Sequence, residues 1–322
     1  MDVVIDAAEA NACSAWVVID WFSDALDKTY FQDVFVGNLS ALALDPDGNI
    51  AALSDRSTLF TLDAATRAPV RAMRLLDENG READFEALVF DHDGSLLVAS
   101  EGSDVRRYTR DGTFVRILPA NDGLRVAPAG RARVNETFEG LALQPGGLTL
   151  VASMEGPLLG DDPRLLRFQT WERDRLDAEF RIAGQYGYER HTGLAISDIN
   201  ATGDGRLLVV ERGFDRSVGN IIRLYLADPR GVSDVSGVEN LTRQDDVRLM
   251  EKVLLVDMAD CPPLGATNPQ PQANPLLGNI EGMTVTGHTR DGRLKLLMVT
   301  DDNQSAHQTT RLYGLTVRLP SL

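Results

Sequence analysis

The chain has 322 residues, 43% of them hydrophobic, and a formal net charge of −16 because 48 Asp and Glu face 32 Lys and Arg. This apolar content can bury a sizeable core, which excludes wholesale disorder. A surface this acidic repels phosphate backbones and the sequence has no basic stripe, so nucleic acid is not an expected partner. No stretch approaches 18 consecutive apolar residues, so no transmembrane helix is predicted.

The N-terminal residues and the two cysteines are the features that bear on where the protein is located. Residues Met1–Asp6 have neither a basic segment nor a long apolar run, so no secretory signal is visible there. The only two cysteines, Cys13 and Cys261, are too few for a disulfide framework or a Cys-based zinc site. They form either one bridge in an oxidising compartment or two free thiols, and both interpretations stay open.

Five segments along the chain share one pattern: a short apolar strand, a turn containing glycine, and a second apolar strand that ends in an acid. Aliphatic and β-branched runs bounded by Asp-Gly or Gly-Gly are typical of β-hairpins. The predicted hairpins cover residues 40–55, 86–101, 139–155, 198–211 and 281–302. Third strands are predicted at 59–62, 105–108, 165–168, 222–225 and 311–315.

Repeated units of three or four strands predict an all-β fold, a single β-propeller, because radial repetition leaves few exposed sheet edges. A fourth strand is predicted at 115–118, and the run 252–256 falls in the widest gap between copies. Five copies and this extra material predict six blades. We expect the ring to be closed by the N-terminal segment, through either 16–20 or 31–36.

No domain boundary interrupts the copies, so one domain is predicted over residues 1–322. Within it, residues 1–36 form the N-terminal segment and closing strand. Residues 262–278, rich in Gly, Pro and Asn, are predicted to form a long surface loop.

The acids of the hairpins are placed by geometry, since residues equidistant from an antiparallel turn lie beside each other. Pairs centred on the predicted turns are Ser40–Asp55, Glu86–Glu101, Glu139–Glu155, Asp198–Glu211 and Glu281–Asp301. Every hairpin therefore brings its first and last residues to the end away from the turn. Because the first strand of each propeller blade lines the central channel, two concentric acidic rings are expected at one mouth.

Crowded carboxylates raise each other's pKa, and a bound hard cation compensates them. Carboxylate and carbonyl oxygens suit Ca²⁺ or, as an alternative, Mg²⁺. The predicted metal ligands are Glu86, Glu139, Glu211, Glu281 and Asp301. The competing interpretation is that each acid caps loop amides or pairs with an arginine.

Arginines directly follow two of the acids in the sequence. Arg56 and Arg212, together with Asn303, are predicted to present donors to an anionic group, because Arg binds phosphate bidentately. The alternative is that each arginine only neutralises neighbouring acids.

Other catalytic motifs are not found in the sequence. The four histidines are isolated, and no His-Glu-x-x-His, nucleophile elbow or P-loop is present.

Several motifs are similar to those of the bacterial phytase-like family, the "esterase-like activity of phytase" domain. They match in order from about residue 37 to the C-terminus: Asp84–Leu88, Val98–Gly102, Asn135–Leu143, Glu155–Leu158, Gly205–Gly213, Asn279–Gly282 and Thr300–Asn303. Two positions depart, since the first copy has Ser40 in place of an acid and the second has Ala87 in place of glycine. The metal-binding acidic signature of the well-characterised β-propeller phytases has no obvious match, which argues against phytate itself as substrate.

The resemblance implies an exported propeller, periplasmic or secreted, whose acids serve metal-dependent phosphoester hydrolysis. The main hypothesis is therefore a calcium-dependent hydrolase of a small anionic substrate, a phosphate ester, acting as a monomer. Glu101 or Glu155 would act as general base and Arg212 would steady developing charge. Two alternatives stay open: a non-catalytic propeller whose ion is structural and whose loops bind a partner, and a lactonase or esterase by analogy of fold.

Overall fold

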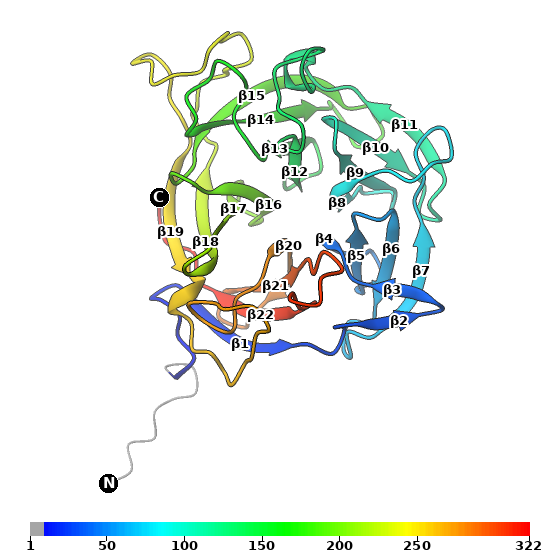
Figure 1. The fold of residues 1–322 in the computed structure, drawn as a ribbon. Helices are drawn as coiled ribbons and strands as arrows, with labels where there is room; N and C mark the ends of the chain where they lie inside the picture. The colour runs from blue at the N-terminus through cyan, green and yellow to red at the C-terminus, as the bar shows by residue number, and fades with distance from the viewer. Residues whose placement is uncertain (1–9) are drawn as a thin grey trace.

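Five four-stranded antiparallel sheets surround a central channel, as Figure 1 shows along the channel axis. The computed structural model describes residues 10–322, so the prediction made for Met1–Asp6 lies outside the described residues. The strands nearest the axis are β4 (Leu39–Leu44), β8 (Phe85–Phe90), β12 (Phe138–Leu143), β16 (Ala195–Ala201) and β20 (Ile280–His288). The fold is a β-propeller with five blades.

The other strands follow outward in each blade. The second strands are β5 (Ile50–Ser54), β9 (Leu96–Ser100), β13 (Thr149–Met154), β17 (Leu207–Asp215) and β21 (Leu294–Thr300). The third strands are β6 (Thr58–Leu62), β10 (Asp104–Tyr108), β14 (Leu165–Glu172), β18 (Gly219–Asp228) and β22 (Leu312–Val317). The outermost are β7 (Pro69–Arg74), β11 (Phe114–Leu118), β15 (Arg181–Glu189), β19 (Glu251–Asp257) and β1 (Val17–Ser23).

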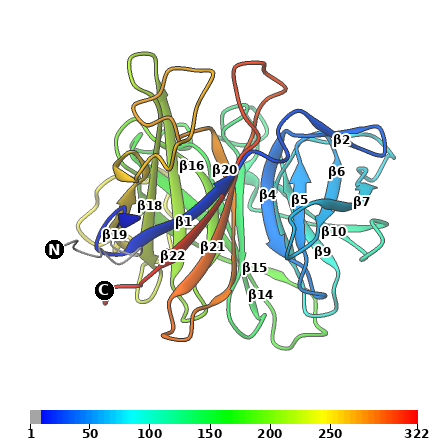
Figure 2. The ribbon, with the colours of Figure 1, turned by 90° about the horizontal axis from the view of Figure 1, so that it is seen from below.

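Short elements lie between the blades. They are a two-stranded hairpin of β2 (Thr29–Phe31) and β3 (Val34–Val36), and the 3₁₀ turns η1 (Asp122–Leu124) and η2 (Met258–Asp260). Figure 2, seen from the side, shows the β2–β3 hairpin and the loop after β21 at the same end of the propeller. Residues 262–279 join η2 to β20 without a helix or strand.

The prediction of six blades is wrong, because the extra strands complete blades that the hairpins begin. The run 252–256 is part of β19, which pairs with β18 as the outer strand of the fourth blade after a loop of residues 229–250. β1 pairs antiparallel with β22 and is the outer strand of the fifth blade. The segment 31–36 contributes instead to the separate β2–β3 hairpin.

A disulfide joins the start of the described chain to a late loop. Cys13 and Cys261 are bonded, with an S–S distance of 2.07 Å across 248 residues of sequence. The bridge fixes the segment before β1 to the residue after η2, next to the fifth blade. It also indicates folding in an oxidising compartment, because such bonds do not persist in reducing ones.

The core lies between neighbouring blades rather than inside any one of them. Second strands such as β9 are apolar without alternation, and Leu96, Leu97, Val98 and Ala99 are all fully buried, because blades cover both of their faces. Sharp turns join the first and second strands; in the β8–β9 turn Gly94 has φ 79°, which favours glycine. In residues 10–322 no helix is long and apolar enough to cross a membrane.

Candidate functional site

The mouth of the channel is shaped by one β-bulge at the start of each inner strand. In every blade the register skips one residue of that strand: Ser40, Glu86, Glu139, Ser197 and Glu281. A bulge leaves its extra residue outside the ladder and re-aims the side chain. We call these five residues the inner ring. Three of them are acids and two are serines.

A second set of residues follows the second strand of each blade. Asp55, Glu101, Glu155 and Asp301 each donate their backbone N–H to the carbonyl of the residue two before the inner-ring position, at 2.7–3.1 Å. In the fourth blade the same place opposite the inner strand is taken by Arg212, which pairs with Ala195. These five residues, Asp55, Glu101, Glu155, Arg212 and Asp301, form the outer ring. It contains four acids and one arginine.

The register of the fourth blade corrects two predictions. The predicted pairing of Asp198 with Glu211 is wrong, because Asp198 pairs with Val210 and Ile196 pairs with Glu211. A slip of one residue moves a side chain to the other face of a sheet. The rings therefore contain Ser197 and Arg212 where the even spacing of the hairpin had indicated Asp198 and Glu211.

Glu211, which was predicted as a metal ligand, belongs to a separate network of side chains and backbone. Its carboxylate accepts hydrogen bonds from Tyr188 Oη at 2.7 Å and from the backbone N–H of His191 at 2.7 Å, and it is ion-paired with Lys252. The ammonium of Lys252 also lies 4.0 Å from the ring centre of Tyr225. No ligand is needed to neutralise this buried carboxylate.

Asp198 joins two blades. Its carboxylate accepts the backbone N–H of Ile199 at 2.8 Å and that of Met283, in β20, at 2.7 Å. Burial raises the pKa of Asp198 well above its usual range, although both N–H groups oppose this. The side chain therefore connects β16 to β20 and does not take part in the mouth.

Two acids of the inner ring, Glu139 and Glu281, are buried, and Glu86 is half-buried. The carboxyl groups of Glu86 and Asp84 are hydrogen-bonded to each other. Burial raises the pKa of Glu86 well above its usual range, and Asp84, Glu281 and Glu101 raise it further. Burial likewise raises the pKa of Glu139, together with Glu86 and Glu155 and against Arg212.

Arg212 is the one cationic member of the two rings. Its guanidinium lies 3.2 Å from Glu281 Oε1 and 3.4 Å from Glu155 Oε1, and it donates to Asn279 Oδ1 at 3.3 Å. Burial disfavours its charge, but the surrounding carboxylates outweigh burial and raise its pKa. One positive charge thus faces the acids of four blades.

The outer-ring acids also have raised pKa values. Burial raises the pKa of Asp55 to about 7 and that of Asp301 to about 8, with neighbouring carboxylates adding to both shifts. Burial raises the pKa of Glu155 to about 7 against the opposing charge of Arg212. Burial raises the pKa of Glu101, whose Oε2 accepts the Thr137 hydroxyl at 2.9 Å.

The two predicted substrate-binding residues other than Arg212 lie at the edge of the mouth. The Arg56 side chain is 69% exposed, and its Nε lies 3.5 Å from Asp55 Oδ1. Asn303 is exposed in the loop after β21, where its side-chain amide donates to Gln308 Oε1 at 3.0 Å. Both are free to meet a molecule that approaches from solvent.

Several polar residues of the mouth escaped prediction from sequence. Asn38, Asp84, Thr137 and Asn279 occupy the position two residues before the inner ring in four blades, and Lys28 Nζ lies 2.6 Å from buried Asp302. A polar residue at that fixed offset was visible in the sequence as a repeated signal. Lys28 had no such signal, because it comes from outside the blades.

The carboxylates of the mouth are spread around it. Within residues 10–322, one group of three acidic or histidine side chains has its ligand atoms within 4.8 Å of one another. It consists of Asp91, His92 and Asp93, and none of these residues belongs to the rings. That group lies in the β8–β9 turn at the other end of the channel, and Arg173 binds Asp91 at 2.5 and 2.9 Å. A cation at the mouth would therefore need ligands from more than one residue type, or water, to complete its shell.

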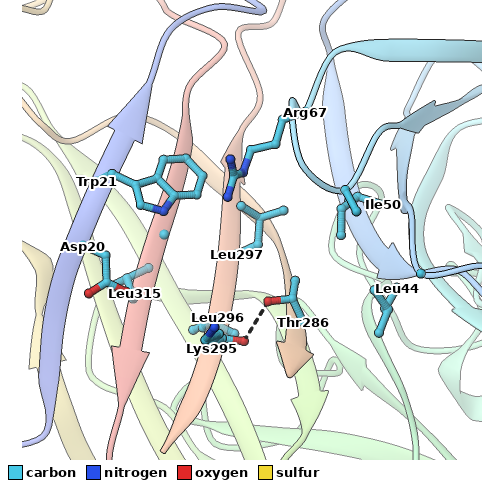
Figure 3. A pocket seen from close by; sticks show the side chains of 13 residues that line it. Asp20, Trp21, Leu44, Ile50, Arg67, Thr286, Lys295, Leu296, Leu297 and Leu315 are labelled. Atoms are coloured by element: carbon cyan, nitrogen blue, oxygen red, sulfur yellow. Dashed lines mark hydrogen bonds between the residues drawn. The ribbon is translucent and has the colours of Figure 1, made fainter. Parts of the chain in front are cut away.

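Two cavities lie away from the mouth. Figure 3 shows one of about 360 Å³ between the first and fifth blades, where the Arg67 guanidinium stacks 3.9 Å from the Trp21 ring centre and Thr286 Oγ1 donates to the Lys295 carbonyl. The other, of about 300 Å³, lies among the inner strands near their turns and is lined by Leu42, Leu88, Leu143, Val285 and other largely apolar residues. Neither contains a residue of the two rings.

Comparison with known proteins identifies the class. The phytase-like family, described as "esterase-like activity of phytase", matches residues 34–304, and the chain belongs to this family. The match covers all five inner strands and both rings. A search of curated proteins found no match.

Two solved structures have limited similarity to the chain. The chain is similar to the WD40 repeats of RRP9, with 11% identity, a TM-score of 0.44, and coverage of 94% of this chain and 98% of that one. It is also similar to the glutaminyl cyclase of Myxococcus xanthus, with 16% identity, a TM-score of 0.45, and coverage of 88% and 92%. At these scores neither likeness carries an argument about activity.

Proposed function

We propose that this protein is a calcium-dependent hydrolase of phosphate esters that acts at the acidic mouth of the propeller. The observation that carries the proposal is the pair of inner-ring glutamates, half-buried Glu86 and buried Glu139, whose pKa values are raised beside a single arginine. So much uncompensated negative charge destabilises a fold unless it serves binding. Membership of the phytase-like family supports hydrolytic chemistry on a phosphate ester.

The residues of the rings would share the work. Glu86, Glu139, Glu281 and Asp301 offer oxygen ligands to Ca²⁺ or, as an alternative, Mg²⁺. When bound, the cation would polarise the phosphoryl group and favour attack by water. Phytate itself is not the proposed substrate, because the acidic signature of β-propeller phytases has no match in this sequence.

Arg212 would hold the phosphoryl group on the side opposite the acid-rich blades. Its guanidinium bridges Glu155 and Glu281, yet its buried Nε has no hydrogen-bond partner in residues 10–322. An arginine in this state has a donor left for an anionic ligand, and its planar fork matches phosphate oxygens. Arg56 and Asn303 would contact the rest of the substrate from the exposed edge.

Glu155 or Glu101 would take the proton from the attacking water. Burial raises the pKa of Glu155 to about 7, which suits a general base at neutral pH. The pKa of Glu101 is also raised by burial, but one of its oxygens is engaged by Thr137. Glu155 is therefore the stronger candidate of the two.

The disulfide and the family match suggest an extracellular or periplasmic protein, and we propose that it works there as a monomer on a small anionic substrate. The test is a panel of phosphomonoesters, phosphodiesters and lactones, with Ca²⁺ and with a chelator, on wild type and Glu139→Gln. Calcium-dependent turnover of a phosphate ester that is lost in Glu139→Gln, with the fold intact by circular dichroism, supports the proposal. Absence of turnover on every substrate while calcium still binds refutes it and favours a binding module.

A further inference from the structure

Three buried oxygens at the mouth end of the first blade have no hydrogen-bond partner: Asn38 Oδ1, Ser40 Oγ and Asp55 Oδ1. Asn38 and Ser40 are each only 1% exposed. Residues 10–322 contain eight such side-chain atoms, so three of them fall at one end of a single blade. Because an unsatisfied buried polar group destabilises the folded state, a partner shared by all three is expected.

The backbone places the three residues next to one another. The N–H of Asp55 donates to the Asn38 carbonyl at 3.0 Å, and Ser40 is the bulged residue just after the Leu39–Ser54 pair. The N–H of Asn38 in turn donates to Asp302 Oδ1 at 3.0 Å, which ties this blade to the fifth. The three oxygens therefore belong to neighbouring positions of one rigid strand end.

Two of the same positions, one in the fourth blade and one in the fifth, have partners within the protein. Ser197, the inner-ring serine of the fourth blade, donates its hydroxyl to the Ile280 carbonyl at 3.0 Å. Asn279, the fifth-blade equivalent of Asn38, donates to Glu281 at 2.8 Å and accepts from Arg212. The serine and the asparagine that match Ser40 and Asn38 in these two blades are thus bonded, so the unpartnered oxygens of the first blade do not follow from the repeat alone.

The surrounding charge selects the kind of partner. Asp84, Glu281 and Asp302 are the carboxylates that raise the pKa of Asp55. Lys28 pairs with Asp302, and the largely exposed Arg56 has its Nε 3.5 Å from Asp55 Oδ1 without a hydrogen bond to it. An amide oxygen, a hydroxyl and a carboxylate in an acidic surrounding are ligands for a hard cation.

We propose that Asn38, Ser40 and Asp55 form a Ca²⁺ site in the first blade, completed by water and by the neighbouring carboxylates. The site deepens the proposed function, on which it rests for its role in hydrolysis, by placing the cation beside Asp55 rather than at the centre of the rings. It also gives Ser40 a role at the position where three other blades carry glutamate.

The test is calcium titration calorimetry on chelator-treated full-length protein. Ser40→Ala and Asp55→Asn are each expected to weaken calcium binding, the second by about tenfold or more. The matched control is Ser197→Ala, which alters the same ring position in the fourth blade and should leave calcium affinity unchanged. Circular dichroism and melting without calcium show that each variant is folded.

Two outcomes would overturn the site: unchanged calcium affinity in both Ser40→Ala and Asp55→Asn, or no calcium binding by the wild type. In either case water alone would be the partner of the three oxygens. Binding and turnover are measured separately, so the two proposals fail separately. Calcium binding that is lost in Asp55→Asn, in a protein without phosphoesterase activity, supports the site and refutes the function. Calcium-dependent turnover that survives with unchanged affinity in Asp55→Asn supports the function and refutes the site.

Discussion

The two ends of the channel are built from the same five inner strands and differ completely in chemistry. At the mouth these strands begin with the inner ring, where buried carboxylates carry raised pKa values. Near the turns the same strands present Leu42, Leu88 and Val285 to a largely apolar cavity. The far end contributes stability through packing, whereas the mouth holds charge that destabilises the fold without a ligand.

The bulges explain how one strand can serve both ends. After the skipped residue, pairing in β4 is continuous from Ala41 to Leu44, and β8, β12 and β16 resume in the same way, whereas β20 has a second bulge between Val285 and Gly287. The ladder therefore holds the apolar half rigidly, while one unpaired residue at the mouth is free to face the channel. A functional site on a rigid strand end keeps its geometry better than one on a loop.

The largest effect on stability is expected when an acid, as found at the mouth, is introduced at the apolar far end of the channel. Leu88→Glu would bury a charge beside apolar neighbours and no arginine, and should lower the free energy of unfolding by about 4 kcal/mol or more, or prevent folding. Urea denaturation measures the change, with Leu88→Met as the volume-matched control. Wild-type stability for Leu88→Glu would show that the far end is hydrated like the mouth.

The second effect removes the one cation of the rings. Arg212→Met leaves Glu155 and Glu281 without their partner, and should lower the stability of calcium-free protein by about 3 kcal/mol at neutral pH. Arg56→Met, at an exposed side chain, should change stability little. The loss in Arg212→Met should shrink in acid, where the carboxylates are protonated; an equal loss at every pH would contradict the electrostatic account.

A third effect concerns pH. Folding raises the pKa of Asp55 and Glu155 to about 7 and that of Asp301 to about 8, so the folded protein keeps protons that the unfolded chain has already released. This contribution to stability is therefore complete below the unfolded pKa values near 4 and is lost as pH rises through 7 to 8. With chelator, the melting temperature should fall by about 5 °C or more between about pH 5 and about pH 8.5. Calcium should remove most of that fall, and a flat profile in both conditions would argue against charge repulsion at the mouth.

The smallest effect separates two glutamates. Glu139→Gln removes an unbonded charge and should raise the stability of calcium-free protein by about 1 kcal/mol while it weakens calcium binding. Glu211→Gln should instead lower stability, because Glu211 is ion-paired with Lys252 and bonded to Tyr188. Thermal melts with chelator decide between them, and a shift of the same sign in both variants would mean that the two carboxylates share one environment.

The sequence by itself determined the hairpins and the end at which their acids gather. Turn pairs such as Asp93-Gly94 and Gly146-Gly147 are local signals, and they lie where the structure has the β8–β9 and β12–β13 turns. Family membership was also readable from motifs along the chain, and the match over residues 34–304 confirms it. These features depend on neighbours in sequence, which is why pattern and turn chemistry suffice for them.

Only the tertiary structure decided the number of blades, the members of the rings and the state of the cysteines. The outer strands β19 and β1 reach their sheets across long separations, so their assignment depends on packing and not on spacing. The bulge in β16 moved Arg212 into the outer ring and Glu211 out of it, because one unpaired residue reverses the face of all that follow. The net charge of −16 is visible in composition, but where it is buried, and beside which oxygens, follows from how five strand ends converge on one axis.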